Sequence, residues 1–253
     1  MKPFKDIILK AIWTDNIRKE EVLDFINTQD RVFKNSYSVK KFEKKYNDNI
    51  YGKSLIILAY LDNKCVGARA FWRNDIEGMK AYQPCDTAVL EDYRGYGIFT
   101  KINDKGLKNI EENTLIYNFP NDNSLPGNLK MGWKIHSRRR YKIFNPIINS
   151  KEIMKVDEKY FEWLLNDTNS KNIDLLKYVC LNKKYYLLRK RAKNIYLIIG
   201  EIHKESALFI SKAKFPILLH YSSKGYIGRG IVTVIRNTNK EINIPLYKID
   251  TLF

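Results

Sequence analysis

The chain has 253 residues, of which 44% are hydrophobic and 13% aromatic, so we expect a folded protein with a substantial core and exclude an intrinsically disordered one. Its 45 lysines and arginines outnumber 28 aspartates and glutamates, which gives a formal net charge of +17. This excess predicts an anionic partner, of the kind found in nucleic acids, membrane surfaces or phosphorylated small molecules.

The cysteines and histidines indicate neither a disulfide framework nor a metal site. Cys65, Cys85 and Cys180 are odd in number and widely spaced, and no histidine lies at a zinc-like spacing from them. The apolar run at residues 7–9 is interrupted by Lys10, so we expect no signal peptide, and no run is long enough to cross a bilayer. We therefore expect a cytoplasmic protein without a metal and without membrane association.

Hydrophobic periodicity predicts a mixed series of strands and helices over the first 145 or so residues. Apolar runs bounded by turn residues predict strands at residues 7–13, 54–61, 65–73, 78–90, 114–119 and 141–144. Apolar residues at helical spacing predict helices at residues 17–29, 38–46 and 98–109, with a short irregular helix over 121–131. The polar residues 62–64 between the second and third strands predict a hairpin.

From Pro146 onward the pattern becomes mainly β. Two short helices are predicted at residues 160–165 and 173–181. Strands are predicted at residues 185–188, 195–202, 207–210, 217–221 and 230–235. We place a domain boundary here, with a first domain of residues 1–147 and a smaller second domain of residues 148–253. The sequence shows no internal repeat.

The stretch 93–100, Tyr-Arg-Gly-Tyr-Gly-Ile-Phe-Thr, joins a predicted strand to a predicted helix. Glycine permits positive φ and a close approach of the backbone to an anion, while the first N–H groups of the helix and its dipole favour negative charge. Arg94 adds a guanidinium fork that suits phosphate oxygens. The alternative is an ordinary turn before a core helix. The stretch favours a phosphate site.

Residues 54–144 resemble the GNAT superfamily of acyl-CoA-dependent N-acetyltransferases. The pyrophosphate signature of that family is Arg or Gln, two residues, Gly, one residue, then Gly or Ala. Arg94 and Gly97 match it, and Phe99 replaces the final small residue. Downstream, Asn121 and the pair Gly132-Trp133 look like the Asn and the Gly-Phe pair of the family. The stretch as a whole resembles acetyltransferases associated with bacterial surface-sugar pathways.

The resemblance implies an α/β (α+β) fold with a mixed central sheet flanked by helices, followed by a smaller β-rich C-terminal region that completes the acceptor pocket. It implies that the pyrophosphate of acetyl-CoA, or of another acyl-CoA, lies on Arg94, Gly95, Tyr96, Gly97, Ile98, Phe99 and Thr100. The pantetheine arm would pair with the strand edge at Ala88 and Val89. Asn121 and Ser124 would line the far side of the thioester.

The catalytic groups are less clearly marked than the donor site. The chemistry needs a base for the attacking amine and an acid for the departing thiolate. Asp86, the carboxylate nearest the glycine turn, is the candidate base, although a solvated strand-end residue is an equal alternative. Asn128 stands where many family members have the acidic tyrosine, so Tyr117 is the candidate acid. Further candidates are Tyr82 and Tyr96 as acids, and Glu77, His136, the carboxylate of Phe253 or a water relay as bases.

The function implied by the resemblance is transfer of an acetyl or longer acyl group to the amine of a small acceptor, such as an amino sugar nucleotide. Asn128 also fits an acyl-CoA-binding module without turnover. Basic clusters near tyrosines suggest a nucleic-acid-associated protein, or an acetyltransferase acting on a charged RNA. These clusters are residues 40–41, 44–45, 138–140 and 189–191. We favour a solvated basic surface for them, because the sequence contains no recognition helix.

Overall fold

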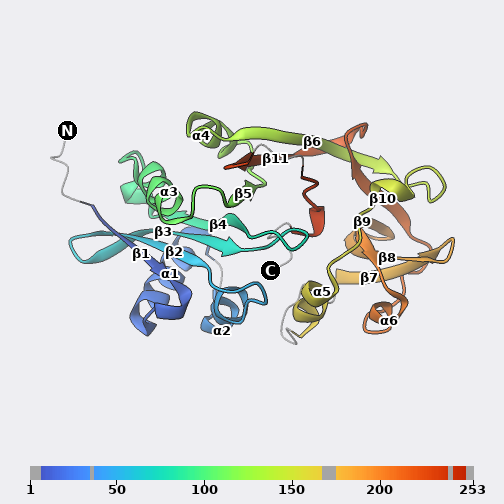
Figure 1. Ribbon diagram of the computed structural model, residues 1–253, viewed down its shortest axis with the longest axis horizontal. Coiled ribbons are helices and arrows are strands. Elements are labelled where there is room, and N and C mark those ends of the chain that lie inside the picture. Colours follow the sequence, from blue (N-terminus) through green and yellow to red (C-terminus); the bar gives the residue numbers. More distant parts are fainter. Residues whose placement is uncertain (1–6, 35–36, 167–174, 239–241, 249–253) are drawn as a thin grey trace. The chain divides into compact units, whose positions relative to one another are not determined.

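The computed structural model describes residues 7–34, 37–166, 175–238 and 242–248. The chain forms two compact units (Figure 1). The first contains residues 1–134 and 234–240, and the second contains residues 135–233 and 241–253. In contrast to a single boundary after residue 147, the chain leaves the first unit at residue 134 and returns to it at residue 234.

The first unit is built on a mixed sheet. Its strands, in sheet order, are β1 (Ile8–Trp13), β2 (Leu55–Leu61), β3 (Lys64–Arg73), β4 (Ala81–Val89), β5 (Leu115–Asn118) and the last residues of β11 (Ile227–Arg236). The first four strands are antiparallel to one another in succession, β5 is parallel to β4, and β11 is antiparallel to β5. A late segment of the chain therefore completes the sheet of the first unit.

Helices cover both faces of this sheet. On one face α1 (Lys19–Phe33) packs against β3 and β4, and α2 (Val39–Phe42) continues into the π-helical turn η2 (Glu43–Asn47). On the other face α3 (Ile98–Asn109) packs against β2 and β3 (Figure 1). Side chains of a strand alternate between faces. Phe71 of β3 accordingly lies against Gly106 of α3, and Trp72 lies on the side of η2.

The second unit contains the other strands of the chain. In sheet order they are residues 227–233 of β11, then β6 (Lys134–Ile143), β10 (Ile217–Ser222), β9 (Ile195–Ile202), β8 (Lys184–Ala192) and β7 (Leu176–Leu181). The accompanying helices are α5 (Glu158–Leu165) and α6 (Lys204–Ala207), with the 3₁₀ turns η4 (Ser150–Glu152) and η6 (Leu246–Lys248). Phe144, Tyr186, Leu188 and Ile198 belong to its buried core.

The strand order of the second unit repeats that of the first. The repeated part is β2, β3 and β4 in the first unit and β7, β8 and β9 in the second: three antiparallel strands, followed by a helical crossover and by a strand parallel to the last of the three. In both, the ladder between the second and third of these strands shifts register, once in β3–β4, between Ala68 and Ala70, and twice in β8–β9, between Leu187 and Leu188 and between Lys190 and Ala192. The chain thus has an internal repeat of topology that the sequence does not show.

The predicted α/β fold is confirmed, and most of its elements are present. Two predictions in the second unit are wrong. The described part of the predicted helix 173–181 is the strand β7, because the apolar residues of this segment pair with β8. The predicted strand 207–210 is the end of α6 and a following turn, in which Leu208 and Phe209 are about three-quarters exposed (76% and 75%). An apolar run predicted burial there, and the structure leaves it in solvent.

Candidate active site

Two glycines shape the turn that joins β4 to α3. After β4, the 3₁₀ turn η3 (Glu91–Tyr93) leads to Arg94. Gly95 and Gly97 have φ values of 85° and 71°, a region in which a residue with a side chain is strained. A Cβ placed on either glycine would meet no atom within 4 Å. Glycine is therefore needed for the backbone conformation, and the space above the turn is open.

The N-terminus of α3 presents backbone amides at this turn. The first hydrogen bond of the helix ladder runs from the N–H of Lys101 to the carbonyl oxygen of Gly97, at 3.0 Å. The amides of Ile98, Phe99 and Thr100 precede that bond, and no side chain caps them. Together with the helix dipole, these donors form an environment that favours an anion.

Arg94 lies at the surface beside the turn. Its side chain is 56% exposed, with Nε 3.4 Å from the carbonyl oxygen of Val89 and Nη1 3.9 Å from the carboxylate of Glu91. Because these contacts are long and solvated, the guanidinium can exchange them for phosphate oxygens at little cost.

Arg69 is a second cation at the start of α3, and the sequence analysis missed it. The residue is 2% exposed, and its guanidinium lies over the rings of Phe71 and Phe99 at 5.5 and 5.4 Å. Burial lowers the pKa of Arg69 to about 10, so the group stays charged at neutral pH. Its Nε has no hydrogen-bond partner among the described residues. An arginine inside the apolar run of β3 was the available signal.

The edge of β4 that faces β5 is only briefly paired. The parallel ladder between the two strands joins Ala81 to Leu115 and Tyr82 to Ile116, and it extends no further in the described part of the chain. Ala88 and Val89, in contrast, pair with β3 on the other edge. The β4 edge toward β5 at Ala88 and Val89 is where a pantetheine arm was expected to pair, and strand pairing does not occupy it.

Asn121 and Ser124 form the start of α4 (Leu125–Lys130). The hydroxyl of Ser124 donates to Asn121 Oδ1 at 3.0 Å, and its amide donates to the same oxygen at 2.9 Å. Asn128, in the position of the expected tyrosine, is 1% exposed and donates from Nδ2 to the carbonyl of Ser124. A Cβ on Gly127 would lie 3.5 Å from the ring of Phe99, so α4 lies beside the first turn of α3.

Asp86 lies inside β4, at the bulge, with a φ of 44° and a side chain that is 21% exposed. Its Oδ2 accepts hydrogen bonds from Tyr37 Oη at 2.9 Å, from Lys45 Nζ at 3.1 Å and from the hydroxyl of Tyr46. The backbone carbonyl of Asp86 accepts a bond from Gln29. This is not the solvated strand end that the sequence left open.

The charges of this cluster are strongly coupled. Burial raises the pKa of Asp86, but the charge of Lys45 and the hydroxyls of Tyr46 and Tyr37 outweigh it, so the pKa lies below its usual value. Lys45 is 2% exposed, although the sequence placed it in a solvated basic cluster. The π-helical turn η2 adds a residue to the helical repeat and directs Lys45 inward.

The other catalytic candidates are scattered. Tyr117 is fully buried, and its hydroxyl donates to the carbonyl of Asn74 at 3.1 Å. Tyr82 is buried against Trp13, whereas Tyr96 is 39% exposed at the glycine turn. Glu77 is exposed in the turn before β4, and His136 belongs to the second unit. Phe253 lies outside the described residues.

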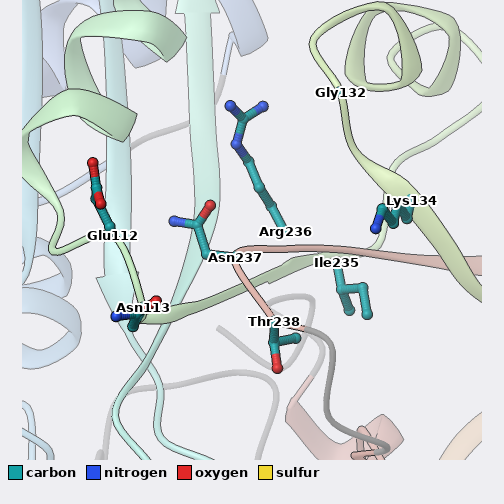
Figure 2. A pocket seen from close by; sticks show the side chains of 8 residues that line it. All are labelled: Glu112, Asn113, Gly132, Lys134, Ile235, Arg236, Asn237 and Thr238. Atoms are coloured by element: carbon teal, nitrogen blue, oxygen red, sulfur yellow. The ribbon is translucent and has the colours of Figure 1, made fainter.

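Two adjoining cavities, of about 310 and 460 Å³, lie where α3 ends and β5 begins. Figure 2 shows the smaller, in which Arg236 of β11, Glu112 and Lys134 surround the opening. The side chain of Arg236 donates to the carbonyl of Met131. No predicted site residue lines either cavity, so they are separate from the glycine turn.

Among the described residues, no three histidine, cysteine, aspartate or glutamate side chains are grouped so that they could hold a metal ion. No helix in the same part of the chain combines the length and the apolar character needed to span a membrane.

An uncapped helix N-terminus after a positive-φ glycine turn, beside a strand edge that its neighbour pairs only at Ala81 and Tyr82, is an arrangement that can hold a phosphorylated ligand. Residues 14–136 match the family model of the acetyltransferase (GNAT) domain. Residues 14–136 are therefore similar to a GNAT-type N-acetyltransferase domain, and proteins of that family use acyl-CoA as co-substrate and an amine as acceptor.

Three solved structures share the fold over most of the chain. A candidate acetyltransferase from Pyrococcus horikoshii has a TM-score of 0.53 and 10% identity, covering 97% of this chain and 95% of that one. A GCN5-related N-acetyltransferase from Kribbella flavida has a TM-score of 0.52 and 12% identity, with 90% and 71% covered. A candidate N-acyltransferase from Enterococcus faecalis has a TM-score of 0.53 and 11% identity, with 92% and 73% covered. No curated protein matches the chain.

Proposed function

We propose that the protein transfers an acetyl or longer acyl group from acyl-CoA to the amine of a small acceptor, and that the acceptor is an amino sugar linked to a nucleotide. The observation that carries the donor half is the glycine turn at Gly95 and Gly97, with open space above it and uncapped amides behind it. The excess of basic residues supports a phosphorylated acceptor.

In this proposal the pyrophosphate of the donor lies on the amides of residues 95–100, beside Arg94. The pantetheine arm pairs with β4 at Ala88 and Val89, whose edge toward β5 is not paired there. Asn121 and Ser124 line the far side of the thioester. Arg69 adds a buried positive charge below the first turn of α3, which strengthens binding of a negatively charged donor.

Asp86 is the proposed contact for the acceptor amine. All three side-chain donors of its cluster bond to Oδ2, which leaves Oδ1 to accept an N–H of the acceptor. The lowered pKa keeps the carboxylate ionised at neutral pH, so it favours a cationic amine. Such a carboxylate is a weak base, and the proton therefore passes on to water.

Acetyl-CoA binding to the purified protein, measured by calorimetry, tests the donor half. We expect saturable binding that Arg94→Ala weakens by about 1.5–3 kcal/mol, the value of a charged hydrogen bond. Gly97→Val should be worse, because its side chain strains the positive φ and blocks the approach of the phosphate. Gly78→Val is the matched control, since Gly78 has a φ of 76° and equally open space, at the opposite end of β4.

Unchanged CoA affinity in the Gly97 variant would contradict the site. The acceptor half is tested with a panel of amines, including nucleotide-linked amino sugars, by following CoA release. Binding of acetyl-CoA without acceptor-dependent release across that panel would instead favour a binding module without turnover.

A further inference from the structure

Two tyrosines form a stacked pair on the sheet of the second unit. Tyr141 of β6 and Tyr221 of β10 are opposite each other in the antiparallel ladder. Their ring centroids are 4.5 Å apart, with an angle of 25° between the planes. Both residues are half-buried, so the pair presents aromatic surface to solvent.

The hydrogen bonds of this pair leave donors without acceptors. The hydroxyl oxygen of Tyr141 accepts a bond from the hydroxyl of Tyr221 at 2.9 Å and another from Arg191 Nη2 at 2.9 Å. A hydroxyl has two acceptor positions and one proton, so the proton of Tyr141 remains to be donated. No described residue accepts it, and Arg191 forms no ion pair with the described part of the chain. The polar groups that remain available here, the Tyr141 proton and N–H groups of Arg191, are therefore all hydrogen-bond donors.

The surroundings are positively charged. Burial lowers the pKa of Arg189, and the charge of Arg191 lowers it further, which shows that the two guanidinium groups are close. Arg191 also lies 6.0 Å from the ring centroid of Tyr141. Residues 135–233 contain 20 lysines and arginines and eight aspartates and glutamates. A cluster of donors in such a field suits an anion.

We propose that Tyr141, Tyr221 and Arg191 form a nucleotide site, in which the guanidinium and the Tyr141 hydroxyl hold a phosphate group and the tyrosine pair stacks on the base. Guanidinium and hydroxyl donors match phosphate oxygens, and stacking on an aromatic side chain stabilises any base. The site deepens the proposed function, on which it rests for the source of the nucleotide, because it gives the second unit a ligand of the class to which the proposed acceptor belongs.

The site fits a mononucleotide better than a nucleic-acid strand. Strand neighbours of Tyr141, namely Arg140 and Lys142, point to the opposite face of β6 because side chains alternate. The basic run at residues 138–140 therefore gives no continuous track of charge on the face of the tyrosine pair. A single-stranded nucleic acid needs such a track along its backbone.

The second unit also lacks the features that hold a donor in the first. The connection from β9 to β10 begins at His203 and contains only the four-residue helix α6. It has no glycine turn and no long helix whose first amides could hold a pyrophosphate. A nucleotide bound at the tyrosine pair is therefore held by side chains.

Calorimetry with UDP on the full chain, without CoA, tests the proposal. We expect Arg191→Gln to weaken UDP binding about tenfold or more, a loss typical of a charged hydrogen bond. Tyr141→Phe should also weaken it, while keeping the stack. Lys193→Gln is the control, because it removes the same charge from the adjacent turn, and it should leave UDP affinity within about twofold.

Inorganic pyrophosphate and a deoxythymidine oligonucleotide are the comparison probes. Tighter binding of UDP than of pyrophosphate, lost in Arg191→Gln, supports a stacked base. No UDP binding at millimolar concentration overturns the proposal, as does Arg191-dependent binding of the oligonucleotide alone. Acetyl-CoA binding separates this result from the donor site: Arg191→Gln should leave it unchanged, and Arg94→Ala should leave UDP binding unchanged.

Discussion

Replacing Asp86 with Asn is the most informative change in the first unit. The substitution removes the charge that balances Lys45, and it keeps the size of the side chain and an oxygen that Tyr37 and Tyr46 can still bond. The Nζ of Lys45 lies 3.1 Å from Asp86 Oδ2, and the lysine side chain is 2% exposed. The variant therefore removes the carboxylate that is bonded to this buried ammonium.

Removing one partner of a buried ion pair costs about 3–5 kcal/mol. Loss of the lysine proton limits this cost, because burial lowers the pKa of a lysine that has no partner. In Lys45→Met/Asp86→Asn both charges are absent, and a neutral pair of similar volume is often no less stable than the ion pair. We expect the double variant to recover more than half of the stability lost by Asp86→Asn.

Hydrogen exchange of the β3 and β4 amides under increasing urea is the suitable assay. A chain of two units does not guarantee a two-state transition, and these strands report on the first unit alone. Since the folded pKa of Asp86 lies below its unfolded value of 3.8, its stabilisation is present above that value and is lost as the pH falls through the folded pKa. Asp86→Asn should lack this acid-side dependence.

If Asp86→Asn unfolds within about 0.5 kcal/mol of the parent, the reasoning about the buried pair is refuted. Activity of the double variant then separates stability from chemistry. Because Asp86 is the proposed contact for the acceptor amine, a stable double variant should still have strongly reduced turnover. Recovery of activity together with stability would remove Asp86 from the reaction.

Three further predictions concern the first unit. Tyr117→Phe should lower stability by about 1 kcal/mol, through the lost bond to the Asn74 carbonyl, and leave kcat nearly unchanged; a 10²-fold loss of kcat would make Tyr117 the general acid. Gly106→Ala should destabilise by about 1–3 kcal/mol in thermal melts, because its Cβ would lie 2.0 Å from the Phe71 ring; an unchanged Tm would contradict the packing. A fragment of residues 1–147 should aggregate in light scattering, because β5 loses its β11 partner; a soluble monomer that binds acetyl-CoA would show that β11 is dispensable.

The geometry of the glycine turn could be predicted from the sequence because it is set locally. Positive φ at Gly95 and Gly97, and the helix that begins at Ile98, follow from consecutive residues. The Asp86 cluster could not be predicted from the sequence, since Lys45 and Asp86 are 41 residues apart and a π-helical turn sets the direction of the lysine side chain. The place of β11 in the sheet could not be predicted either, because its last residues pair with β5 across more than a hundred positions of sequence.

The two units repeat a topology but not the glycine turn, and this difference indicates which kind of ligand each unit can bind. The strand order of a fold sets where a crossover helix can lie, but the residues of the crossover decide whether it can hold an anion. In the first unit that crossover has two positive-φ glycines and the 12-residue helix α3; in the second it has the four-residue helix α6. Among the described residues, only the crossover of the first unit therefore has the features that the proposed donor site needs. The second unit is then free to bind a different ligand, and its excess of basic residues suits one that is negatively charged.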